Sequence, residues 1–395
     1  MTDSRAMNAA PNTTRLVEYE RFPYAVESVD LTFDLHPSET HVRQISKWRK
    51  TIPGVTSLEL NGKDLQRISI KIDGELVDES RLVEIDESLL IRQVPDAFTL
   101  EVVTQINPEA NTALEGLYLS NGMFCTQCEA EGFRRITYYP DRPDVMSIFT
   151  TRIIADPDYP VLLSNGNLVS NNQMEDGRWE AVWQDPFLKP CYLFALVGGD
   201  LAVKCDKFVT MSGREIDLRI YVEKRDLNRV RYALESLKRA MKWDENVYGR
   251  EYDLDIFMIV AVSHFNMGAM ENKGLNIFNS SCVLASPEAA TDQAFQRIEA
   301  IVAHEYFHNW SGNRVTCRDW FQLSLKEGFT VFRDSEFSAD INSRAVKRIQ
   351  DVNFLRSAQF TEDAGPTAHP VQPLEYQEIS NFYTLTIYEK GAEVV

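Results

Sequence analysis

The chain has 395 residues, of which 59 are acidic and 41 basic, giving a net charge of −18. This excess of negative charge argues against a general nucleic-acid binder, because such proteins hold phosphates on basic surfaces. The apolar content of 44% is ordinary for a globular protein, and the length allows two or more domains. No run of about 18 apolar residues is present, so no transmembrane segment is expected.

The N-terminal residues 1–14 are polar and lack the apolar core of a secretory signal. We therefore expect a cytoplasmic protein and leave peripheral association with a membrane open. The six cysteines fit a reducing compartment. Cys125 and Cys128 have the spacing of a redox or zinc half-site, but no second close pair follows, so neither function is favoured.

The first half of the chain alternates apolar and polar residues, as half-buried strands do. This pattern predicts strands over residues 31–35, 68–72 and 98–102. Asn-Gly and Asp-Gly pairs at 61–62, 73–74 and 165–166 are turn signals between such segments. We expect a largely antiparallel β domain over residues 1–199, with a junction at 198–200.

The second half, residues 200–395, combines strands with helices. Residues 217–222 alternate like a strand, and Asp226 is the expected cap of the helix that follows. The apolar face of that helix contains Val230, Leu234, Leu237 and Met241. The continuous apolar run over 256–262 has the length of a buried strand.

The segment 304–308, His-Glu-Tyr-Phe-His, carries two histidines four residues apart. Thr291 is the expected cap of its helix and Gly312 the expected stop. On such a helix both imidazoles lie on one face and can share a tetrahedral Zn²⁺. Glu305 can then accept a proton from a water on that metal. The alternative is a pair of core histidines held by ordinary hydrogen bonds.

A second helix is expected over residues 323–332, with Glu327 nineteen residues after His308. Two histidines and one glutamate leave a fourth position for water, which is the catalytic arrangement of zinc. The alternative is that Glu327 is a surface carboxylate. We predict one Zn²⁺ per chain, bound by His304, His308 and Glu327.

Residues 266–272, Asn-Met-Gly-Ala-Met-Glu-Asn, lie between the buried strand over 256–262 and the helix that carries His304 and His308. With the zinc motif, they resemble the aminopeptidase N family of gluzincin metallopeptidases, especially its bacterial alanyl aminopeptidase branch. The resemblance extends through 124–133, 309–316 and 381–385. It implies a mixed α and β fold: a mostly antiparallel N-terminal β domain, then a thermolysin-like α/β zinc peptidase domain. That second domain is expected to be truncated at residue 395, because the family has further C-terminal domains.

The resemblance also implies roles for individual residues. The expected activity is removal of N-terminal residues from peptides with broad specificity, with Glu305 as general base and Tyr388 stabilising the oxyanion. Glu271 and Glu129 match the carboxylates that hold the free α-ammonium group. The other positions that match substrate contacts are Gln127, Met267, Gly268, Ala269, Met270 and Asn272. The expected partner is a peptide with a free N-terminus, and the expected form is a monomer.

Two residues depart from the pattern of the bacterial branch: Cys282 replaces a tyrosine and His264 a larger apolar residue. Neither is required for zinc or for the amine. Three alternative functions fit the sequence less well. A thermolysin-type endopeptidase has no need for the Glu271 and Glu129 pair, and the related epoxide hydrolases usually have Gly-Gly before Met-Glu-Asn. A catalytically inactive binding protein would be expected to lack a ligand, the base or the oxyanion residue.

Overall fold

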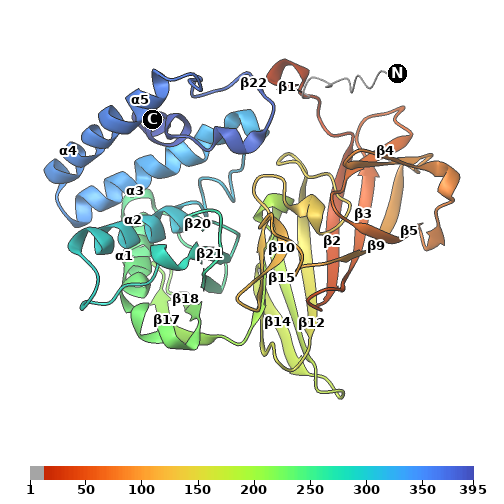
Figure 1. Cartoon of the computed structure of the whole chain (residues 1–395), viewed down its shortest axis with the longest axis horizontal. Coiled ribbons are helices and arrows are strands. Elements are labelled where there is room, and N and C mark those ends of the chain that lie inside the picture. Colours follow the sequence, from red (N-terminus) through yellow and green to blue (C-terminus); the bar gives the residue numbers. More distant parts are fainter. Residues whose placement is uncertain (1–12) are drawn as a thin grey trace, which may run out of the picture.

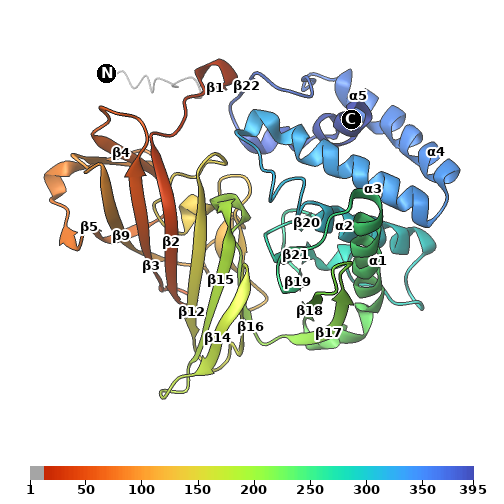
Figure 2. The same cartoon turned by 180° about the vertical axis from the view of Figure 1, so that it is seen from behind.

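Two structural units lie side by side in the computed structural model, which describes residues 13–395 (Figure 1). The first unit is built from strands, and the second places helices over a smaller sheet. The same division is visible from behind (Figure 2). This is the mixed α and β architecture that the sequence predicts.

The first unit is centred on an eight-stranded sheet. Its strands alternate buried and exposed residues, so one face packs into the core. All neighbouring pairs are antiparallel except β12 and β2, which are parallel. In spatial order the strands are β14 (Asn167–Gln173), β15 (Trp179–Pro190), β12 (Met146–Ala155), β2 (Tyr24–Asp34), β3 (Thr40–Lys50), β9 (Ala97–Ile106), β5 (Gln66–Ile72) and β6 (Glu75–Leu76).

Two smaller sheets complete this unit. One consists of β4 (Ser57–Asn61), β8 (Ser88–Arg92) and β7 (Leu82–Ile85). The other lies against the second unit and consists of β10 (Gly116–Ser120), β11 (Met123–Gln127), β16 (Leu196–Gly199) and β13 (Val161–Ser164). Tyr118 on β10 donates a hydrogen bond to the carbonyl of His264 in the second unit, at 3.0 Å. The strand predicted at 31–35 overlaps only the end of β2, and those predicted at 68–72 and 98–102 lie within β5 and β9.

The second unit begins with a five-stranded sheet, in which β18, β19 and β21 are parallel. Every residue of β19 is buried, which explains its continuous apolar sequence. The order is β17 (Ala202–Val209), β18 (Glu215–Val222), β19 (Ile256–Val262), β21 (Leu275–Asn279) and β20 (Ala269–Met270), so β20 is an edge strand. β16, which includes the first two residues of the expected junction, and β17, which follows it, belong to different sheets.

Helices cover this sheet and form a further layer above it (Figure 1). Their bounds are α1 (Arg231–Tyr248), α2 (Asp292–Phe307), α3 (Glu327–Ile341), α4 (Arg344–Phe354), α5 (Phe360–Asp363) and α6 (Gly391–Val394). A short ladder of β1 (Thr14–Arg15) with β22 (Glu375–Tyr376) joins the start of the described chain to this layer. Within residues 13–395, no helix has both the length and the apolar character needed to span a bilayer.

Three predicted helix ends differ from the structure. α1 begins at Arg231 rather than after Asp226, because the Asp226 carboxylate pairs with Arg229 at 2.9 Å instead of capping the backbone. Residues 320–325 form a 3₁₀ helix capped by Asp319, so the α-helical conformation starts only at Glu327. α2 ends at Phe307, before Gly312.

Gly312 has a different function from the predicted helix stop. Its φ is +139°, and a β-carbon there would lie 2.9 Å from Nδ1 of His308. Glycine is therefore required by the close approach of the chain to this histidine.

Candidate active site

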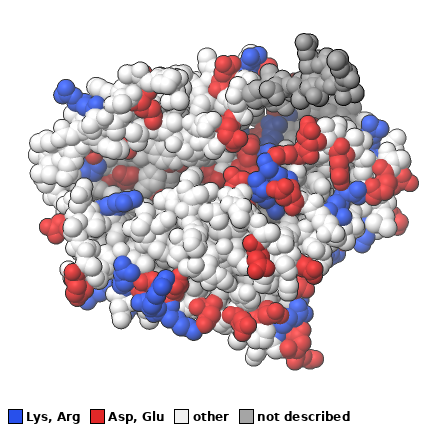
Figure 3. Space-filling view, in the orientation of Figure 1, with Lys and Arg blue, Asp and Glu red and all other residues white. Residues whose placement is uncertain are grey.

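A cavity of about 1100 Å³ lies between α2, α3, α4 and the edge strand β20 of the second unit, and Glu129 of the first unit also lines it. Figure 3 shows a hollow with acidic side chains at its floor. The residues that line the cavity include His304, Glu305, His308 and Glu327. The histidine motif and the glutamate nineteen residues later are thus in one place.

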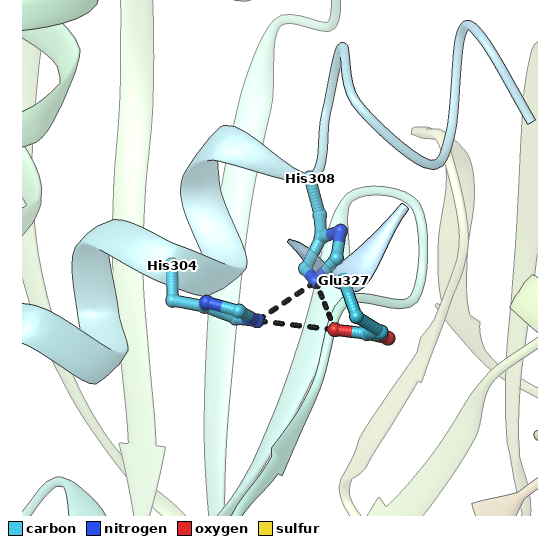
Figure 4. A group of neighbouring side chains, drawn as sticks. All are labelled: His304, His308 and Glu327. Carbon is cyan, nitrogen blue, oxygen red and sulfur yellow. Dashed lines mark hydrogen bonds and ion pairs between the residues drawn. The ribbon is translucent and has the colours of Figure 1, made fainter. Parts of the chain in front are cut away.

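His304 and His308 project from the end of α2, and Glu327 projects from the first turn of α3 (Figure 4). Their two Nε2 atoms are 3.0 Å apart, and Glu327 Oε2 is 3.4 Å from His304 Nε2 and 3.3 Å from His308 Nε2. In a tetrahedron with bonds of about 2.0–2.2 Å, ligand atoms are about 3.3–3.6 Å apart. The observed triangle is close to that size, so these residues fit a zinc ion.

The remaining nitrogen of each imidazole is engaged, which leaves Nε2 directed at the common point. Nδ1 of His304 lies 2.6 Å from Asp334 Oδ2, and Nδ1 of His308 lies 2.8 Å from the carbonyl oxygen of Ser311. Such contacts fix the ring orientation and the tautomer of metal-binding histidines. Asp334 follows Glu327 by seven residues, or two turns of α3, so both carboxylates lie on the same face of α3.

The electrostatic environment prepares the triad for a cation. Burial opposes ionisation of Glu327, but Lys326, His308 and His304 outweigh it, and its pKa lies well below the usual range. Burial likewise opposes protonation of His304, yet the hydrogen bonds to Asp334 and Glu327 raise its pKa well above normal. The ionised Glu327 gives the triad a negatively charged ligand, as a divalent cation requires.

Glu305 is buried beside the triad and lines the same cavity. Its Oε2 has no hydrogen-bond partner among residues 13–395. Burial raises its pKa to about 8 in the metal-free protein; His304 opposes this rise, and Glu271 and Glu327 reinforce it. Its carboxyl group is placed to exchange a proton with a molecule bound at the triad.

Two further carboxylates meet next to the triad, one from each unit. Glu129 follows β11 of the first unit, and Glu271 follows β20 of the second. Lys326 lies between them: its Nζ is 2.6 Å from Glu129 Oε1, 2.5 Å from Glu271 Oε1 and 2.6 Å from Glu327 Oε1. Tyr383 donates a hydrogen bond to Glu129 Oε1 at 2.9 Å. The site is therefore shared between the two units.

The pKa values of this group follow from its charges. Burial and the neighbouring Glu271 raise the pKa of Glu129 to about 8, against the effect of Lys326. Burial opposes ionisation of Glu271, but His308 and Lys326 outweigh it and lower its pKa. The three carboxylates outweigh the effect of burial on Lys326 and raise its pKa well above the usual range, so its ammonium group is charged.

The other predicted site residues fall into two sets. Tyr388 lines the cavity, and burial and Glu327 raise its pKa well above normal, so its phenol keeps a proton to donate. Met267, Gly268 and Ala269 also line the cavity. Gln127, Met270 and Asn272 are buried and are not among the lining residues; Gln127 Nε2 donates to the carbonyl of Glu129 at 3.1 Å.

The two departures from the family pattern also lie apart. His264 is exposed and does not line the cavity. Cys282 is buried beneath Gly268, where a β-carbon on the glycine would lie 3.8 Å from its sulfur.

Three residues of the site were not predicted from the sequence: Lys326, Tyr383 and Asp334. Lys326 directly precedes Glu327, but adjacency does not indicate that it turns toward Glu129 and Glu271. For Asp334, the seven-residue spacing from Glu327 was a usable signal. For Tyr383, which contacts a residue 254 positions earlier, the sequence contains no local signal.

Comparison with known proteins agrees with this geometry. Residues 28–193 match the Peptidase M1 N-terminal domain, and residues 232–395 match the Peptidase family M1 domain. The chain is 60% identical to "Aminopeptidase N" of Caulobacter vibrioides and 56% identical to "Aminopeptidase N" of Escherichia coli. Each match covers 98% of this chain but only 45% of the relative, so the chain spans less than half the length of these proteins.

Among solved structures, aminopeptidase A of Legionella pneumophila in complex with aspartic acid has a TM-score of 0.89 and 35% sequence identity. That match covers 97% of this chain and 44% of the Legionella chain. The likeness in fold therefore includes both units. By its two matched domains and its fold, the chain belongs to peptidase family M1.

Proposed function

We propose that this chain carries the active site of a zinc-dependent aminopeptidase that removes N-terminal residues from peptides with broad specificity. One observation carries the proposal: a pair of carboxylates, Glu129 and Glu271, lies immediately beside a His-His-Glu metal triad in one cavity. A metal site alone suits many hydrolases. Two buried carboxyl groups next to it are suited to accept hydrogen bonds from a substrate ammonium group.

The residues that would hold the metal are His304, His308 and Glu327. Among residues 13–395, two further groups of three acidic or imidazole side chains are close enough to share an ion, but neither contains two imidazoles. One of them, Glu129 with Glu271 and Glu327, contains no imidazole at all, and zinc favours nitrogen ligands of this kind. When bound at the triad, Zn²⁺ would supply a Lewis acid that acidifies water and polarises the carbonyl group.

The side chains of this protein then divide the remaining work. Glu129 and Glu271 bind the α-ammonium group and so place the first peptide bond at the triad. Glu305 accepts the proton of the attacking water and returns it to the departing amine. Tyr388 donates a hydrogen bond to the carbonyl oxygen, where negative charge develops during attack.

Broad specificity is favoured by the residues around the first side chain. Met267 is flexible and polarisable, so it can pack against side chains of different shapes. Gly268 and Ala269 leave room for a peptide backbone to approach closely. An endopeptidase would need space for residues before the cleaved bond, and here the Glu129, Glu271 and Lys326 group fills that position.

The proposal can be tested with alanine p-nitroanilide and its N-acetylated counterpart, using full-length protein expressed from its native gene. The wild type should cleave only the anilide with a free amine, and a chelator should abolish this cleavage. Glu271→Gln keeps the shape of the side chain but not its charge, and should lower kcat/KM for the free amine at least about tenfold. Efficient cleavage of the acetylated substrate, or cleavage that persists with chelator, would refute the proposal.

A further inference from the structure

The active-site cavity is acidic where Glu129 and Glu271 lie, and another part of it carries an arginine. Apart from the two histidines, the basic residues among its described lining residues are Lys347 and Arg297. Lys347 pairs with Asp351. Arg297 is exposed, and within residues 13–395 its only side-chain hydrogen bond is a 3.7 Å contact with Cys282 Sγ. Its charge is therefore available to a ligand.

The direction of α2 separates this arginine from the acidic pair. His308, at the end of α2, lies within 4.0 Å of Glu271. Arg297 lies seven residues before His304, or about 10 Å farther along a helix axis that rises about 1.5 Å per residue. The triad therefore lies between the acidic pair and Arg297 along this axis.

The edge strand β20 defines the path of a bound peptide. A peptide whose ammonium group is at Glu271 could extend beside this strand in either of two directions. The parallel direction leads along Asn272 and Lys273, which are buried. The antiparallel direction leads along Ala269 and then Gly268, which line the cavity. The peptide therefore runs antiparallel to β20, and the residue after the cleaved bond reaches Gly268.

Gly268 connects this path to the arginine. The sulfur of Cys282 lies 3.8 Å from the position that a β-carbon on Gly268 would occupy, and the same sulfur accepts the contact from Arg297 Nη2. The sulfur atom of Cys282 thus lies between the guanidinium group of Arg297 and Gly268, beside which the peptide passes. A carboxylate on the residue opposite Gly268 is within reach of an arginine side chain.

We propose that Arg297 is a specificity-determining residue that binds a carboxylate on the residue following the cleaved bond. The carboxylate can be an acidic side chain or the terminal carboxylate of a dipeptide. This inference rests on the proposed aminopeptidase function and adds a substrate class to it: peptides with an ammonium group at one end and a carboxylate near the cleaved bond.

The test compares four substrates with full-length protein from its native gene: Ala-Gln-amide, Ala-Glu-amide, Ala-Gln with a free terminus, and Ala-Lys-amide. Relative to Ala-Gln-amide, the wild type should favour a carboxylate substrate by about threefold to tenfold in kcat/KM, mainly through KM. The preference should weaken at high salt. Preference for Ala-Glu-amide identifies the side chain as the ligand, and preference for free Ala-Gln identifies the terminus.

Arg297→Gln should bring the ratios of kcat/KM, each taken relative to Ala-Gln-amide, to about one. Arg297→Glu should make Ala-Lys-amide the preferred substrate. Because each result is a ratio within one protein sample, partial misfolding does not affect it. Arg21→Gln removes an exposed arginine of the first unit and should keep the wild-type ratios. Equal cleavage of all four substrates by the wild type, or ratios that persist in Arg297→Gln, would overturn the inference alone. Failure to release alanine from any substrate would overturn the proposed function, and this inference with it.

Discussion

Lys326→Met should strongly destabilise the second unit, because it removes an ammonium group that contacts three buried carboxylates. The distances from Nζ to Glu129, Glu271 and Glu327 are 2.5–2.6 Å, and the lysine is 1% exposed. Methionine has a similar length and can fill the volume. The loss is therefore chiefly of charge, and it leaves buried anions without their partner.

Breaking a buried ion pair by removing one partner costs about 3–5 kcal/mol. For a domain of about 150–250 residues, each kcal/mol corresponds to roughly 2–4 °C in Tm. We therefore expect the thermal unfolding of this unit, in metal-loaded protein, to shift down by about 6–20 °C.

The matched control is Lys390→Met. Lys390 pairs with Asp363 at 2.6 Å, but their side chains are 39% and 32% exposed. A surface pair of this kind contributes less than about 1 kcal/mol. Calorimetry of both variants should separate the two cases clearly. A Lys326→Met protein that unfolds at the temperature of the wild type or of the control would refute the view that this ammonium group holds the carboxylates together.

Four further outcomes are expected of full-length protein. Glu305→Gln cannot accept a proton, so kcat should fall at least about 10²-fold with metal content unchanged; near-normal turnover would exclude it as the base. Tyr388→Phe should lower kcat by about 10²–10³-fold with little change in KM, and a normal kcat would remove the phenol from the mechanism. Asp334→Asn should weaken zinc binding about 10- to 100-fold in a competition titration with a chelator, because His304 loses its orienting carboxylate. His304→Ala should lose its equivalent of zinc in metal analysis; full retention would place the metal elsewhere.

Local periodicity predicted much of the fold. The apolar run over 256–262 became β19 with the same bounds, and Thr291 caps α2 as expected, accepting a hydrogen bond from the backbone of Ala294 at 3.2 Å. Alternation also located β2, β5 and β9. These features are set by neighbouring residues, whose pattern of burial repeats with the period of the element.

Helix ends were predicted less well, because side chains there have competing partners. Asp226 has the chemistry of a cap but pairs with Arg229. Gly312 has the chemistry of a helix stop, yet its conformation serves the approach of the chain to His308.

The site divides in the same way. The spacing of His304, His308 and Glu327 placed three donors together before any fold was known. The position of Glu129 depends on the sheet that contains β10, β11 and β16. This sheet places Glu129, a residue of the first unit, against the second unit. The spacing of residues along the sequence does not predict this placement of Glu129, which only the family resemblance indicated. The contacts of Lys326 and the free charge of Arg297 likewise depend on tertiary packing.

In the proposed function, the cavity binds the free α-amine of a peptide, and the peptide bond next to that amine is cleaved. The most direct measurement is mass spectrometry of the first products from one unstructured peptide of about eight residues and from its N-acetylated twin, each with the full-length protein. We expect loss of a single residue from the free N-terminus, no cleavage of the acetylated twin, and no cleavage of either with chelator. Cleavage of the acetylated peptide at an interior bond would contradict it.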